Sequence, residues 1–110
     1  MTELCDLECA PCRGGVPPMA PEEIATYLTR LGGGWEVIDH HHLTKTYEFP
    51  DFATALAFTN AMGAVAEAQG HHPDIYLAWG KVQLTIWTHK IDGLAEADFV
   101  LAAKADRLAR

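Results

Sequence analysis

Six histidines offer the clearest chemistry in this sequence. They fall into three groups: His40, His41 and His42 together, His71 and His72 together, and His89 alone. An unperturbed imidazole has a pKa of about 6.5, so near neutral pH one histidine can donate a proton while another accepts one. The sequence contains neither a serine-nucleophile motif nor a glycine-rich phosphate loop. Histidine acid/base chemistry is therefore the first hypothesis.

His71 and His72 stand at the junction between a predicted helix and a predicted strand. They directly follow Gly70, which is suited to end the helix, and binding groups often lie at such corners. If the strands on either side of Gly80 pair as a regular antiparallel hairpin, residues 71 and 89 lie opposite each other, because each is nine positions from Gly80. A bulge or a slipped register would separate them.

Helices and strand pairs must alternate to position these histidines. Apolar residues at helical spacing, period-two alternation and capping residues such as Asp51 predict three helices and four strands. The helices cover 21–31, 51–70 and 94–108, and the strands cover 35–38, 43–49, 75–79 and 81–89. The order is α-β-β-α-β-β-α. It predicts an α+β two-layer sandwich, with a four-stranded antiparallel sheet and three helices on one face.

Length and composition indicate a single domain. At 110 residues the chain has room for one hydrophobic core. Residues 1–20 contain several Pro and Gly and show no periodicity, so we expect an irregular N-terminal arm followed by one domain over residues 21–110. The net charge of −7, without a Lys or Arg cluster, argues against nucleic-acid or anionic-membrane partners. Neither a membrane span nor a signal peptide is evident, so we expect a cytoplasmic protein.

Several short motifs follow one another in a fixed order. Gly34-Trp35 comes first, then the stretch from Glu67 to Asp74 with His71-His72-Pro73, then Thr88-His89, and finally Gly93-Leu94 followed by Asp98. A lone His-His-Pro would be weak evidence, but here the other motifs accompany it in the expected order of elements. From Trp35 to Asp98 the sequence resembles the pterin-4a-carbinolamine dehydratases, also known as dimerisation cofactors of a homeodomain transcription factor.

The resemblance implies a role for individual residues. It implies three catalytic histidines, His71, His72 and His89, and four substrate-binding or supporting residues, Glu67, Asp98, Pro73 and Asp74. We expect His71 and His89 to be the acid/base pair and His72 to orient the pterin. The carboxylates of Asp98 or Glu67 would fix the tautomers of the histidines. The chain departs from the family at Ala95, where a Ser or Thr is common, which predicts a looser turn before Asp98.

The resemblance also implies a reaction and an assembly. The reaction is loss of water from a 4a-hydroxytetrahydropterin (pterin-4a-carbinolamine) to give a quinonoid dihydropterin, in tetrahydrobiopterin-type cofactor recycling. Such a lyase needs no metal and no organic cofactor. We expect a homodimer or homotetramer, with an aromatic amino-acid hydroxylase pathway as the source of the pterin substrate. The alternative is a non-catalytic protein-interaction or assembly module on the same fold.

Two other uses of histidine compete with this interpretation. A zinc hydrolase would also use three histidines and one open coordination position. In an extended chain, however, the adjacent His71 and His72 point to opposite faces, which makes them a poor chelating pair. The other group, His40, His41 and His42, falls at a predicted hairpin connection, where a solvated polar turn is expected.

Three cysteines, Cys5, Cys9 and Cys12, share the spacing C-x3-C-x2-C. Radical enzymes that hold a four-iron cluster through thiolates have this spacing. Those enzymes need a large barrel domain, for which the rest of the chain is too short. We therefore expect incidental thiols on the N-terminal arm, with a structural or adventitious zinc site as the alternative.

Overall fold

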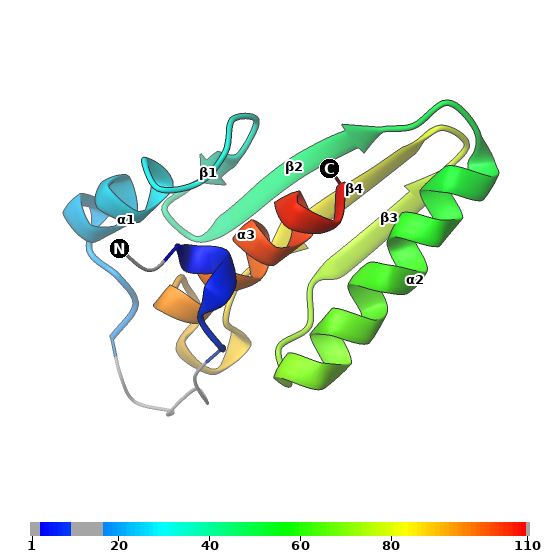
Figure 1. Ribbon diagram of the computed structural model, residues 1–110. Helices are drawn as coiled ribbons and strands as arrows, with labels where there is room; N and C mark the ends of the chain where they lie inside the picture. Colours follow the sequence, from blue (N-terminus) through cyan, green and yellow to red (C-terminus); the bar gives the residue numbers. More distant parts are fainter. Residues whose placement is uncertain (1–2, 10–16, 110) are drawn as a thin grey trace.

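A four-stranded sheet with helices packed on one face forms the described part of the protein (Figure 1). The structure is a computed structural model, and it describes residues 3–9 and 17–109. The helices are α1 (Pro21–Leu28), α2 (Phe52–Gln69) and α3 (Glu96–Ala109), with the short 3-10 helices η1 (Leu4–Asp6) and η2 (His89–Ile91). The strands are β1 (Glu36–Ile38), β2 (His42–Glu48), β3 (Asp74–Ala78) and β4 (Lys81–Ile86). The predicted α+β class and order of elements are confirmed.

The sheet joins two hairpins through its central strands. Its strand order is β1-β2-β4-β3, and every neighbouring pair is antiparallel. The strand β3 therefore lies at one edge, beside α2, which contacts both β3 and β4 (Figure 1). The helix α3 packs on β2 and β4 and against α2, and α1 contacts α3.

The register of the β3–β4 hairpin corrects one expectation. The turn consists of two residues, Trp79 and Gly80, because Ala78 pairs with Lys81. Gly80 has φ 75°, which suits such a tight turn. Continued to its ends, this register places residue 71 opposite residue 88, so the predicted pairing of 71 with 89 was wrong by one position. In addition, β4 ends at Ile86, and His89 begins η2 instead of ending a strand.

The core fills the space between the sheet and the two long helices. Alternate residues of β4, Val82, Leu84 and Ile86, are fully buried, as period-two alternation predicted. They pack with buried side chains of α2 and α3, among them Phe58, Met62, Phe99 and Leu101.

The two ends of α2 are formed by the residues that the sequence indicated. The Asp51 carboxylate accepts a hydrogen bond from the Thr54 N–H at 2.8 Å, as an N-cap does. Gly70 adopts the left-handed conformation with φ 65°, and the His71 N–H then bonds the Ala66 carbonyl at 3.2 Å. Because the helix ends in this way, His71 leaves α2 in a defined direction.

Part of the expected N-terminal arm is packed on the domain. In η1, Leu4 and Cys5 are buried, and η1 lies against α3. The Lys104 ammonium donates a hydrogen bond to the Cys5 carbonyl at 3.0 Å. The burial of the apolar Leu4 explains why this segment packs on α3. Cys12 lies outside the described residues. Within 3–9 and 17–109, no helix combines the length and the apolar character needed to cross a membrane.

Candidate active site

Asp98, near the start of α3, is the most deeply buried ionisable side chain in the described part of the chain, with 0% exposure. Its Oδ2 accepts a hydrogen bond from the Ala95 N–H at 2.8 Å, just before the helix begins. This is one half of a capping box, in which an acidic residue at the third helical position reaches back to the N-cap backbone. The missing hydroxyl at Ala95 predicts a looser turn, but the Ala95 N–H donates directly to Asp98.

Two more donors meet the same carboxylate. The Nε2 of His71 lies 2.6 Å from Asp98 Oδ1, and the Thr88 hydroxyl donates to Oδ2 at 2.7 Å. Asp98 therefore joins the end of α2 to the segment that follows β4. An ionised carboxylate only accepts hydrogen bonds, so the Nε2 of His71 carries a proton and Nδ1 is the nitrogen that can exchange a proton with a ligand. The His71 side chain is 14% exposed.

His72 makes a different contact from its neighbour. Its Nε2 lies 2.7 Å from Glu67 Oε2, and the two side chains are 59% and 79% exposed. A pair this exposed contributes at most about 1 kcal/mol to stability. The structure thus joins His71 to Asp98 and His72 to Glu67, so each expected carboxylate contacts one histidine.

His89 lies beside the same network. It follows Thr88 directly, is exposed, and stacks on Trp87 with ring centroids 4.0 Å apart. Thr88, the residue before His89, therefore bonds the same carboxylate as His71, even though β4 ends before residue 89. The residues Pro73 and Asp74 lead from His72 into β3, where Asp74 is exposed and pairs with Thr85. Their role in substrate binding stays a prediction.

Two histidines of the 40–42 group do not form the expected solvated turn, because His42 begins β2 and His41 packs against another segment. His41 packs against Trp87, with ring centroids 4.3 Å apart, and its Nε2 lies 2.8 Å from Asp92 Oδ1. His40 is exposed, as expected. Sequence reasoning missed the part played by His41 and Trp87, because the sequence does not show that the β1–β2 hairpin reaches the segment after β4.

Cys9 also lies close to the site. Its N–H donates to Gln69 Oε1 at 2.8 Å, and its Sγ lies 3.6 Å from the Ala97 carbonyl, next to Asp98. Burial raises the pKa of the Cys9 thiol to about 11, so the thiol is protonated at neutral pH. Across residues 3–9 and 17–109, no group of three or more His, Cys, Asp or Glu side chains is arranged to hold a metal ion.

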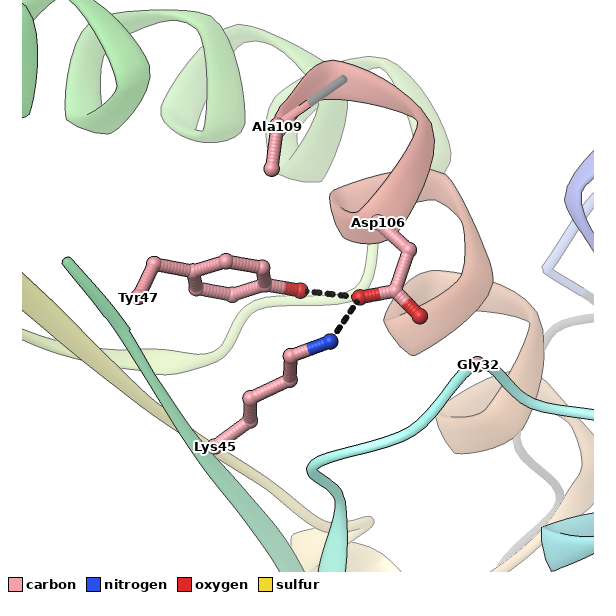
Figure 2. Close-up of a pocket in the computed structure, with 5 residues that line it drawn as sticks. All are labelled: Gly32, Lys45, Tyr47, Asp106 and Ala109. Atoms are coloured by element: carbon pink, nitrogen blue, oxygen red, sulfur yellow. Dashed lines mark hydrogen bonds and ion pairs between the residues drawn. The ribbon is translucent and has the colours of Figure 1, made fainter. Parts of the chain in front are cut away.

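A separate polar cluster lies near the end of α3, around a cavity of about 330 Å³ (Figure 2). Asp106 Oδ1 accepts hydrogen bonds from Lys45 Nζ at 2.7 Å and from the Tyr47 hydroxyl at 2.5 Å, and Oδ2 accepts one from Trp35 Nε1 at 3.0 Å. Lys45 also donates to the Gly33 carbonyl at 2.7 Å. Burial and the bond to Asp106 raise the pKa of Tyr47. Because these polar groups bond one another, we interpret the cluster as structural.

Comparisons with known proteins agree on one family. Residues 17–108 match the family described as Pterin 4 alpha carbinolamine dehydratase. A protein of Rubrobacter xylanophilus named "Putative pterin-4-alpha-carbinolamine dehydratase" is 55% identical over 98% of this chain and 100% of its own length. One of Alkaliphilus metalliredigens with the same name is 50% identical over 97% of this chain and 96% of its own.

Two solved structures are similar as well. The crystal structure of a transcriptional coactivator/pterin dehydratase from Brucella melitensis covers 84% of this chain and 99% of its own, with 31% identity and a TM-score of 0.80. A pterin dehydratase-like protein, identified as a RuBisCO assembly factor in the alpha-carboxysome, covers 69% of this chain and 89% of its own. Its identity is 29% and its TM-score is 0.61.

Proposed function

Because this chain belongs to the pterin 4 alpha carbinolamine dehydratase family, we propose that it removes water from a 4a-hydroxytetrahydropterin by histidine acid/base catalysis. The product is a quinonoid dihydropterin. The reaction serves tetrahydrobiopterin-type cofactor recycling, in which an aromatic amino-acid hydroxylase pathway supplies the pterin substrate. The observation that carries the proposal is the hydrogen bond of 2.6 Å between His71 and the fully buried Asp98.

The reaction needs two proton transfers. The departing hydroxyl group must gain a proton, and a ring nitrogen of the pterin must lose one. His71 performs one transfer through Nδ1, because its Nε2 faces Asp98. The buried carboxylate keeps this tautomer and stabilises the imidazolium that forms when Nδ1 takes up a proton. His89, one residue beyond Thr88, performs the other transfer.

His72 binds and orients the pterin in this proposal. It is exposed beside His71, and its bond to Glu67 holds the ring without burying it. Pro73 and Asp74 follow His72 and lead into β3, and we assign them to the same binding surface. The two proton transfers are thus assigned to His71 and His89, and the binding role to His72, which pairs with Glu67.

Dehydration of freshly generated 4a-carbinolamine, followed by absorbance, tests the proposal. We expect the protein to accelerate the reaction, and we expect His71→Ala and His89→Ala each to lower kcat by about 10²- to 10⁴-fold, the usual contribution of acid/base catalysis. Asp98→Asn should lower it as well, because the amide no longer holds the His71 tautomer. His40→Asn is the matched control, since His40 is exposed in a left-handed turn position that Asn accepts. Wild-type rates in both alanine variants, with unchanged circular dichroism, would refute the mechanism.

A second candidate function is that of a protein-interaction or assembly module. It is favoured by the likeness to the pterin dehydratase-like RuBisCO assembly factor. The presence of all three histidines, two of them bonded to carboxylates, favours the enzyme instead. A wild-type protein that leaves the dehydration rate at its uncatalysed value would favour the assembly role.

We also propose that the protein is a homodimer or homotetramer. Large apolar side chains are exposed on α2 and at the β3 edge of the sheet, namely Phe52, Leu56, Tyr76 and Trp79. An edge strand also presents backbone donors and acceptors that a second copy can pair with. These surfaces are suited to contact between copies of this chain.

A further inference from the structure

His89 belongs to a closed series of side-chain and backbone contacts. It begins η2, and the residue that ends this turn is Asp92, in the left-handed conformation with φ 50°. The Asp92 N–H bonds the His89 carbonyl at 3.2 Å. The imidazole of His89 stacks on Trp87 with an interplanar angle of 34°. Residues on both sides of the turn thus constrain where His89 lies.

The β1–β2 hairpin, from another part of the chain, completes this series of contacts. In the loop of this hairpin, Asp39 and His40 both have φ 54°, and His41 follows them. His41 contacts Trp87 through its ring, at 4.3 Å between centroids, and Asp92 through Nε2, at 2.8 Å. The contacts therefore run from His89 to Trp87, to His41, to Asp92, and back through the turn to His89.

Both nitrogens of His41 are engaged. Nε2 faces the Asp92 carboxylate, which accepts only, so Nε2 carries a proton. Nδ1 lies 3.1 Å from Nδ1 of His42, and in the neutral rings His42 is then the donor. Because it is held at both nitrogens and packs against Trp87, the His41 ring has little freedom to turn.

We propose that Trp87, His41 and Asp92 are positioning residues that fix the imidazole of His89 for proton transfer. Asp92 is 85% exposed, so its bond to His41 adds little to the stability of the fold. Its effect is instead to hold the His41 ring against Trp87, which in turn contacts the exposed His89. The proposal rests on the proposed function in so far as His89 acts in catalysis.

The most direct variant is Asp92→Gly, which removes the carboxylate and keeps the left-handed backbone. We expect kcat to fall about 10- to 100-fold with KM nearly unchanged, because a misplacement of about 1 Å can have an effect of this size. Asp39→Gly is the matched control: it makes the same substitution at an exposed left-handed position of the other loop. Trp87→Leu should lower kcat similarly, and Trp87→Phe, which can still stack, should recover most of it.

A second readout does not depend on activity. The Trp87 ring current should shift the imidazole proton resonances of His89 upfield in the NMR spectrum, and Trp87→Leu should abolish this shift. Asp92→Gly should reduce it, whereas Asp39→Gly should leave it as in the wild type. If the wild type lacks dehydratase activity, the proposed function fails, and the NMR shifts still decide whether the contacts fix His89. Unchanged His89 resonances and unchanged kcat in Asp92→Gly would overturn the positioning role.

Discussion

Two buried carboxylates on α3 have different partners. Asp98 bonds His71, the Thr88 hydroxyl and a backbone N–H, so a histidine is its ionisable partner. Asp106 bonds Lys45, Tyr47 and an indole N–H. A lysine supplies a lasting positive charge near neutral pH, whereas a histidine can gain or lose its proton. The first arrangement suits proton transfer, and the second suits a fixed structural contact.

Removal of the Asp106 carboxylate should therefore destabilise the fold. Asp106→Ala leaves the Lys45 ammonium, 16% exposed, without its charged partner, and also removes the acceptor for Tyr47. Loss of one partner from a buried ion pair typically lowers the free energy of unfolding by about 3–5 kcal/mol. Urea denaturation measures this change.

The matched control is Asp6→Ala, because Asp6 forms an exposed ion pair with Arg107. We expect a much smaller change for this surface pair. Equal losses in the two variants would show that the Asp106 cluster is no more important to the fold than a surface contact.

At the scale of elements, the two glycines of α2 lie in different environments. Gly70 ends the helix with φ 65°, whereas Gly63 lies inside it. A Cβ atom added to either glycine would meet nothing within 4 Å. The effects of alanine at these two positions therefore reflect backbone conformation and not steric clashes.

Opposite effects on stability are expected for these glycines. Gly70→Ala should lower the free energy of unfolding by about 1–2 kcal/mol, because the left-handed conformation is unfavourable for a residue with a Cβ atom. Gly63→Ala should raise it by about 0.5–1 kcal/mol, because alanine favours the helical conformation. Thermal unfolding of both variants tests this, and a loss in Gly63→Ala would indicate that another surface covers position 63.

The elements also mark how far the sequence could predict the structure. The bounds of α2 were predictable, because Asp51 and Gly70 act locally. The hairpin register was not, because Gly80 alone does not say whether the turn has one or two residues. Contacts such as His41 with Asp92, 51 positions apart, depend on how two loops meet, and composition and periodicity carry no signal for that. The resemblance to the family, and not the local patterns, grouped His71, His72 and His89 into one predicted site.

For the whole molecule, the exposed apolar side chains are the unusual feature. Phe52 is 44% exposed and Leu56 39% exposed on α2, and Tyr76 and Trp79 are exposed to 57% and 72% at the edge formed by β3. Each of these would be better placed against a second copy than in water. His71 and His72 follow the opposite end of α2 from Phe52 and Leu56, so an assembly through these surfaces would leave the candidate site outside the contact.

Leu56→Glu should therefore weaken self-association. Sedimentation equilibrium should give a multiple of 12.0 kDa for the wild type and a lower mass for the variant. A buried glutamate in an apolar contact carries a large desolvation cost. Thr26→Glu, on the exposed side of α1, is the control and should leave the mass unchanged. A wild-type mass of one chain would contradict the proposed assembly.

The bond between His71 and Asp98 also has a consequence for biosynthesis. Asp98 is translated 27 residues after its histidine partner and belongs to α3, the last helix along the described chain. A nascent polypeptide whose α3 is still inside the ribosomal exit tunnel could already display His71 but would lack the carboxylate that orients it. Competence for proton transfer should then arise only when α3 docks, which makes dehydratase turnover a sensitive reporter of the final step of folding.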